Sequence, residues 1–148
     1  MAILKNRENN LEFILKPIKK DNFGFLCDVC LSTSIIKIDY KHTSINDKYI
    51  SHKNLDYIKR EYENLNNIEK FLEETEIIFD IYPIDMFMTL DVYKSNSDTL
   101  WVEIKMPTGI FTNGEEIGYF IAFNFWVELD DFKSFILNFI QECEILSI

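Results

Sequence analysis

A strand that runs directly into a helix occupies residues Ile117 to Ile148, and this unit constrains the fold more than any other stretch. Alternation along its first part, IGYFIAFNFWVE, divides the residues between two faces, and both faces are mostly apolar. A strand with one solvated face would carry a polar residue at every second position. The pattern therefore predicts a central strand, covered at least partly on both sides.

The residues after this strand predict a closing helix. Asp130 and Asp131 can accept hydrogen bonds from the free N–H groups of a first helical turn and meet the positive end of the helix dipole. Beyond them, apolar residues recur at spacings of three and four, which is typical of one buried helical stripe. The stripe consists of Phe132, Phe135, Ile136, Phe139, Ile140 and Cys143. We expect Phe135 and Phe139 to be buried against a sheet.

The rest of the chain predicts antiparallel strands and one further helix. Strand patterns cover 11–18, 25–31, 34–41, 77–82, 87–93 and 100–106, and polar loops are expected over 42–53 and 107–116. Asn54 can cap the further helix, in which apolar residues recur at helical spacing as far as Leu72. The predicted fold class is α+β, with about six to seven antiparallel strands in one or more sheets and two helices.

Length and composition predict a single domain over residues 1–148. With 47% hydrophobic residues, a chain of 148 residues can bury a sizeable core without disulfides or metal. The two halves share a similar order of strands followed by a helix. They are either a duplication or two instances of a common arrangement of elements.

The sequence also predicts a cytoplasmic protein that binds neither membranes nor nucleic acid. The first residues, MAILKNRENN, lack the apolar run of a secretory signal, and no stretch approaches the roughly 20 apolar residues of a membrane span. The net charge of -10 argues against phosphate binding, which needs clustered lysine and arginine. This acidity either serves solubility alone or forms a negative face for a basic protein partner.

Cysteines and histidines offer two candidate chemistries. Cys27 and Cys30 match a C-x-x-C pattern, but in a strand residues three apart point to opposite faces, so we interpret both as structural. Cys143 is the only other cysteine, which rules out a four-thiolate metal site. His42 and His52 fall in the predicted polar loop and are interpreted as solvated.

Carboxylate pairs and phosphate-binding motifs give no sign of catalysis. The sequence contains no Walker-type phosphate loop, dinucleotide-binding fingerprint or nucleophile elbow. Adjacent carboxylates at Glu73-Glu74, Glu115-Glu116 and Asp130-Asp131 lie where water is expected, so a desolvated acid and base pair is not indicated. We predict no catalytic residue, no cofactor-binding residue and no metal ligand.

The order of the elements resembles a known family. The segments FLCDVCL, LDYIKREYENL, FDIYPIDMFMTLDVYK, LWVEIKM and IAFNFWVELDDFKSFILNF follow one another as in the WapI type of immunity protein. The resemblance runs from Leu11 to Cys143 and is one of pattern. Asp21-Asn22-Phe23 stands where the family usually has an aspartate and a tryptophan. The resemblance implies a small, non-enzymatic cytoplasmic protein that neutralises a bacterial polymorphic or contact-dependent toxin by stoichiometric binding.

If the toxin is basic, for example a nuclease, exposed carboxylates should contact it. The candidates are Glu61, Glu69 and Glu73 on the exposed side of the middle helix, and Glu115 and Glu116 in the loop over 107–116. The alternative is that these residues are simply solvated and that apolar edge-strand surface binds the partner. Two other functions also remain open, an enzyme whose site has no sequence signature and a subunit of a larger assembly.

Overall fold

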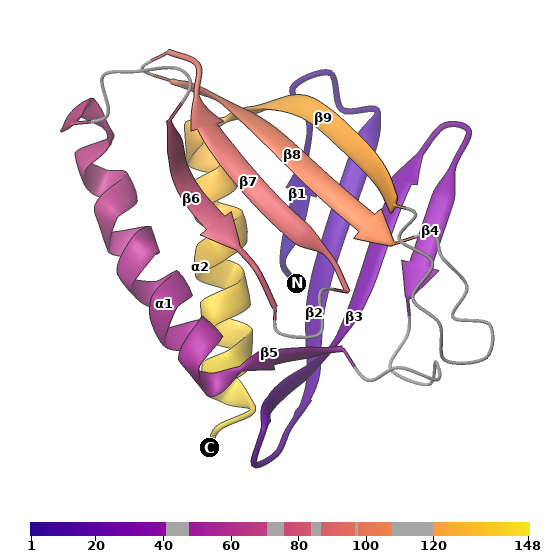
Figure 1. Cartoon of the computed structure of the whole chain (residues 1–148), viewed down its shortest axis with the longest axis vertical. Coiled ribbons are helices and arrows are strands. Elements are labelled where there is room, and N and C mark those ends of the chain that lie inside the picture. The colour runs from indigo at the N-terminus through magenta and orange to yellow at the C-terminus, as the bar shows by residue number, and fades with distance from the viewer. Residues whose placement is uncertain (41–47, 71–75, 84–86, 97, 108–119) are drawn as a thin grey trace.

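The computed structural model describes residues 1–40, 48–70, 76–83, 87–96, 98–107 and 120–148. Within them, nine strands and two α-helices form an α+β fold with two antiparallel sheets (Figure 1). This confirms the predicted fold class. Two of the nine strands, β1 and β5, were not predicted because each has only three residues.

The first sheet is built from the first five strands, with β1, β2, β3 and β4 in sequence order and β5 paired with β3. The bounds are β1 Ile3–Lys5, β2 Leu11–Lys20, β3 Gly24–Thr33, β4 Lys37–Tyr40 and β5 Tyr49–Ser51. Gly24 allows β5 to approach closely. Its φ is +149°, and an added Cβ would lie 2.3 Å from the Ile50 carbonyl oxygen.

The second sheet is a four-stranded meander in sequence order. The bounds are β6 Ile77–Ile81, β7 Thr89–Lys94, β8 Thr99–Pro107 and β9 Phe120–Glu128. The Asn96 side chain shapes the turn between β7 and β8, because its oxygen accepts hydrogen bonds from the backbone N–H groups of Asp98 and Thr99.

Each sheet is followed in sequence by a helix. Helix α1 spans His52–Asn64 and continues as the 3₁₀ helix η1, Leu65–Lys70, so the α-helix ends well before the predicted Leu72. The predicted cap was also wrong: the hydroxyl of Ser51 accepts from the Asn54 N–H and thereby caps α1 three residues earlier. Helix α2 spans Leu129–Ile145 and has Asp130 and Asp131 in its first turn, as predicted, where they meet the positive end of the helix dipole. Its N-cap residue is Glu128, whose side chain makes no capping hydrogen bond.

Helix α2 joins the two sheets into one hydrophobic core. Its Phe135 ring lies 5.9 Å from the Phe13 ring of β2, and its Phe132 ring lies 5.2 Å from the Phe79 ring of β6. Phe135 and Phe139 are both buried, as predicted. None of the described helices is long and apolar enough to cross a membrane.

The prediction that the strand within residues 117–128 is central was wrong. Strand β9 lies at the edge of its sheet, not at its centre. One face points into the core through Phe125 and Val127, whereas Phe120 and Trp126 on the other face are 57% and 45% exposed. Large apolar side chains are thus left in contact with water on one side of β9.

Candidate functional site

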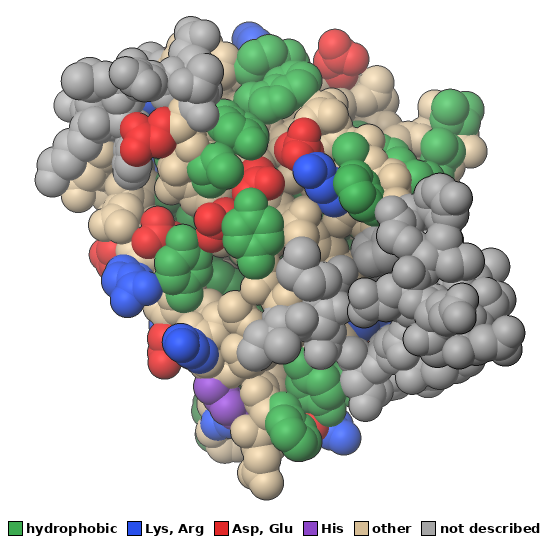
Figure 2. All heavy atoms as spheres, viewed as in Figure 1, with side chains coloured by type: hydrophobic (Ala, Val, Ile, Leu, Met, Phe, Trp, Pro, Cys, Tyr) green, Lys and Arg blue, Asp and Glu red, His purple; other side chains and the backbone are tan. Residues whose placement is uncertain are grey.

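The side of the second sheet that faces away from α2, here called the outer face, carries the most unusual surface of the described chain. Helix α2 packs behind this sheet and α1 flanks its β6 edge (Figure 1). Hydrophobic and acidic side chains gather together over β6 to β9 (Figure 2). The side chains that define the outer face are Asp80, Tyr82, Asp91, Tyr93, Trp101, Glu103, Lys105, Phe120, Asn124 and Trp126.

Three carboxylates lie side by side across this face. In the strand register Asp80 of β6 is opposite Asp91 of β7, and Asp91 is opposite Glu103 of β8. Directly opposite residues have Cβ atoms about 4.5–5.5 Å apart, and like charges in such positions are destabilising. We call these three residues the carboxylate row.

Tyrosine hydroxyls hold two members of the carboxylate row in place. The Tyr82 hydroxyl donates a hydrogen bond to Asp91, and the Tyr57 hydroxyl of α1 donates one to Asp80. Burial raises the pKa of Asp80, the Tyr57 hydrogen bond opposes this rise, and the neighbouring Asp91 charge adds to it. Burial and Asp80 together raise the pKa of Tyr57 to about 12, so this hydroxyl stays a donor at neutral pH.

An aromatic row runs beside the carboxylate row. Tyr93 of β7 is opposite Trp101 of β8, and Trp101 is opposite Trp126 of β9. The two indole rings meet at 4.4 Å in an edge-to-face arrangement. They are the only tryptophans of the chain. Tyr93 and Trp101 are each two residues from a member of the carboxylate row, Asp91 and Glu103, so the two rows are adjacent.

The outer face and its α1 border already hold two cations of the chain itself. The Lys105 ammonium lies 3.3 Å from a Glu103 carboxylate oxygen and 5.3 Å from the centre of the Phe120 ring. The Arg60 guanidinium lies 5.4 Å from the centre of the Tyr57 ring. Aromatic rings and carboxylates at these positions therefore accommodate positive charge.

Only one of the predicted partner-binding residues can be placed beside this surface. Glu61 of α1 is half-buried, and its charge acts on Tyr57, which contacts the Asp80 end of the carboxylate row. Glu69 lies in η1 but its side chain is outside the described part of the structure, and Glu73, Glu115 and Glu116 lie outside the described residues. Sequence reasoning missed Asp80, Asp91 and Glu103 as a group.

The cysteines have the environment expected of structural residues. Cys27 is buried and Cys30, three residues away on β3, is half-buried on the opposite face, as predicted. Burial raises the pKa of Cys27 well above its ordinary value and that of Cys143 to about 12. Both thiols are therefore protonated and unreactive at neutral pH.

The interpretation of His52 as a solvated loop residue was wrong. His52 is the first residue of α1, its Nε2 atom lies 3.0 Å from the Asp21 carbonyl oxygen, and its ring packs edge-on against Phe25. These contacts give His52 a structural role where β5 meets α1. His42 lies outside the described residues.

Neither a metal site nor a small-molecule pocket is part of the outer face as the structure describes it. Among the described residues, no three histidine, cysteine or acidic side chains are arranged to hold a metal ion, and this includes the carboxylate row. A polar depression of about 360 Å³ lies near the β1–β2 hairpin. Its lining is Lys5, Asn9, Asn10, Leu11, Glu12, Ser32, Thr33 and Ser34.

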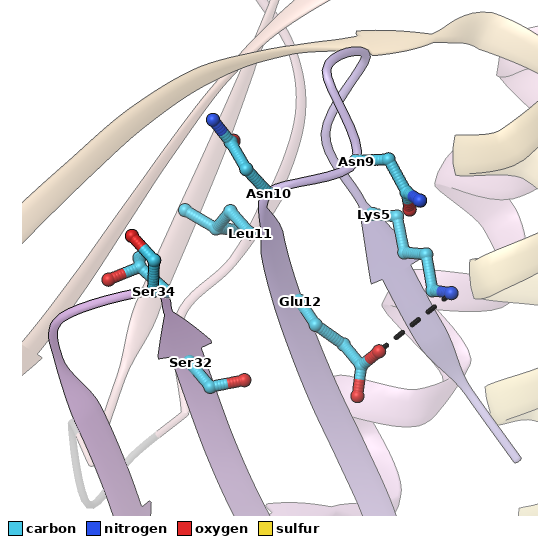
Figure 3. A pocket seen from close by; sticks show the side chains of 8 residues that line it. Lys5, Asn9, Asn10, Leu11, Glu12, Ser32 and Ser34 are labelled. Carbon is cyan, nitrogen blue, oxygen red and sulfur yellow. Dashed lines mark ion pairs between the residues drawn. The ribbon is translucent and has the colours of Figure 1, made fainter.

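The depression does not offer an evident catalytic arrangement. Lys5 and Glu12 point toward each other across it, with 3.9 Å between ammonium and carboxylate (Figure 3). Its lining contains hydroxyl groups but neither a histidine nor a cysteine, so the usual pairing of a nucleophile with an imidazole base is absent from these residues. The outer face is the stronger candidate for a functional surface.

Comparisons with known proteins add no assignment. A scan against protein-family models, a search of curated proteins and a search of solved structures each found no match to this chain.

Proposed function

We propose that this protein binds a bacterial toxin domain in the cytoplasm and neutralises it by stoichiometric contact, as an immunity protein of a polymorphic or contact-dependent toxin system. The outer face would be the contact surface, and the toxin domain would present a basic surface to it. The resemblance of the sequence to WapI-type immunity proteins motivates the toxin as partner. The structure supports the proposal through the chemistry of the outer face.

The observation that carries the proposal is the carboxylate row beside the aromatic row. Like charges in direct cross-strand positions weaken a sheet, and here the Lys105 ion pair offsets this effect at Glu103, whereas Asp80 and Asp91 lie side by side. A basic partner would relieve this repulsion on binding. Departures from the locally favoured choice of residue are expected mainly at functional sites.

The aromatic row supplies apolar area, which is the second property of a protein-binding surface. Tryptophan and tyrosine dominate the binding energy of many interfaces because they bury large areas in rigid side chains. Trp126 is 45% exposed and Phe120 is 57% exposed, so both offer apolar area to a partner. The net charge of -10 would speed the encounter with a basic protein.

The proposal predicts that the reading frame directly upstream of this chain encodes a toxin domain, which is the partner to be used in the test. Co-expression in bacteria should restore growth that the toxin domain alone prevents, and the two purified proteins should form a complex with one copy of each. Glu63→Gln on the exposed side of α1 serves as a control that should protect fully. An upstream frame without a toxin, or a toxin that kills despite co-expression, would contradict the proposal.

A subunit role in a larger assembly is the second candidate, because the exposed Phe120 and Trp126 lie on the edge strand β9. Self-association through this face would bring two carboxylate rows together and is disfavoured by their repulsion. Sedimentation of the purified protein at low and high concentration distinguishes the assembly role from the immunity function. A concentration-dependent oligomer that Trp126→Ser abolishes would favour the assembly role.

A further inference from the structure

We propose that the outer face recognises an arginine-bearing segment of its protein partner. The arginine guanidinium would stack on the Trp101–Trp126 pair, with its N–H groups directed at the carboxylate row. This inference deepens the proposed function and rests on it for the identity of the partner. The recognition chemistry can be tested independently of any toxin.

The spacing of the two rows fits a guanidinium. Neighbouring strands are about 4.8 Å apart, and residues two apart along one strand are separated by about 6.6–6.8 Å. Trp101 and Glu103 are two residues apart on β8, and both side chains lie on the outer face. A flat cation that rests on the indole can therefore turn its N–H edge toward the carboxylate.

The carboxylates have acceptor capacity left for such a ligand. An ionised carboxylate offers about four lone-pair sites, and Asp91 uses one of them for the Tyr82 hydroxyl. Asp91 is only 7% exposed and Asp80 is partly buried. A cation at this row would thus interact with charges that water screens poorly, which strengthens the attraction.

The Lys105 contact shows the same combination within the chain. Its ammonium is shared between a carboxylate, Glu103, and an aromatic ring, Phe120. Arginine is better suited than lysine to the neighbouring Trp101 position, because its planar group stacks on a ring and donates two parallel hydrogen bonds to a carboxylate. Lysine supplies a compact point charge on a flexible stem.

The chain contains its own probe of the outer face. Both of its tryptophans lie in the aromatic row, so the intrinsic indole fluorescence reports on the outer face alone. The ligands to be tested are a short peptide of alternating arginine and serine and the same peptide with lysine in place of arginine. The two peptides carry equal charge and differ only in the chemistry of the cation.

At about 0.1 M salt, the arginine peptide should change the tryptophan emission in a saturable way. Its affinity should exceed that of the lysine peptide by about fivefold, the contribution expected of guanidinium stacking and paired hydrogen bonds. Glu103→Gln should weaken arginine-peptide binding by about fivefold or more, because a neutral amide cannot pair with the cation. Glu63→Gln, which removes the same charge from α1, should leave it unchanged.

Two further variants guard against a change in the fold. Trp126→Phe keeps an aromatic ring at this position and should retain most of the affinity, whereas Trp126→Ser should lose it. Circular dichroism of each variant checks that the fold is kept. The Glu103 side chain is half-buried on the outer face and does not belong to the hydrophobic core, so its substitution leaves the core unchanged.

The inference is overturned by any of three results: no saturable emission change at peptide concentrations up to about 1 mM, equal affinity for both peptides, or equal binding by Glu103→Gln and the parent. Failure of this inference is distinguishable from failure of the proposed function. If the toxin is neutralised while the arginine peptide does not bind, only arginine recognition is wrong. If the peptide binds as expected but no toxin is neutralised, only the immunity function is wrong.

Discussion

Asp91 of β7 lies directly opposite Glu103 of β8, with both side chains on the outer face of the second sheet. A sheet selected for stability alone would place a lysine or threonine at one of these positions, because opposite charges or hydroxyl pairs stabilise cross-strand neighbours. Asp80 extends the same row on β6. The row is thus a stability cost that binding of a basic partner would offset.

Asp80→Asn should stabilise the protein by a few tenths to about 1 kcal/mol at neutral pH, because it removes one like-charge pair. Its side-chain oxygen can still accept the Tyr57 hydrogen bond. Burial raises the pKa of Asp80 in the folded state, so folding favours the protonated form. The parent therefore loses stability as pH rises from the unfolded pKa of about 4 through the raised folded pKa.

Urea denaturation between acidic and neutral pH tests this prediction. The advantage of Asp80→Asn over the parent should be smallest at the acidic end and reach a plateau near neutral pH. Glu63→Gln, an exposed control on α1, should stay within about 0.5 kcal/mol of the parent. An Asp80→Asn protein that is less stable than the parent at neutral pH would show that this carboxylate is not repelled by its neighbour.

Phe135→Ala should lower the free energy of unfolding by about 3–5 kcal/mol, the usual range for a buried aromatic residue. Phe135 contacts Phe13 of β2 and lies in the core that joins both sheets. Leu137→Ala, on the same helix but 37% exposed, should cost much less. Equal losses in both variants, measured by thermal or urea unfolding, would mean that α2 is held by something other than its buried stripe.

The three cysteines should differ in reactivity toward a thiol reagent at neutral pH. Cys27 and Cys143 are buried, and burial raises the pKa of both thiols, so neither should react in the folded protein. Cys30 is half-buried and should react first. Colorimetric titration should give one accessible thiol in buffer and three in denaturant, and Cys30→Ser should remove the accessible one.

The sequence predicted the elements whose pattern repeats over many residues. The stripe from Phe132 to Cys143 predicted α2 and its buried face, because apolar residues that recur with a helical period over three turns cannot line one face of a strand. The two missed strands, β1 and β5, have three residues each and show no alternation long enough to recognise. Strand β9 was predicted to be central because apolar residues on both faces of a strand ordinarily indicate that both faces are covered.

The carboxylate row could not be predicted because it depends on register. Asp80, Asp91 and Glu103 come from three strands, and a shift of one residue in either pairing would send a side chain to the other face. The sequence does show that Trp101, Glu103 and Lys105 share one face of their strand. The apolar residues Phe120 and Trp126, which led to the wrong placement of β9, are part of the surface proposed to bind the partner.

The most direct test of the proposed function is the association rate with the toxin domain as a function of salt, compared between two double variants. Asp80→Asn with Glu103→Gln removes two charges from the outer face, and Glu144→Gln with Glu63→Gln removes two exposed charges on the helices. Both pairs change the net charge equally. They therefore separate the local effect of the carboxylate row from the total charge.

Raising the salt from about 0.1 M to about 1 M shortens the screening length from about 10 Å to about 3 Å. The parent and the Glu144→Gln, Glu63→Gln control should associate quickly at low salt and slow sharply as salt is added. The Asp80→Asn, Glu103→Gln variant should associate about tenfold more slowly at low salt and respond weakly to added salt. If the two double variants instead associate at the same rate at every salt concentration, the carboxylate row is not part of the interface.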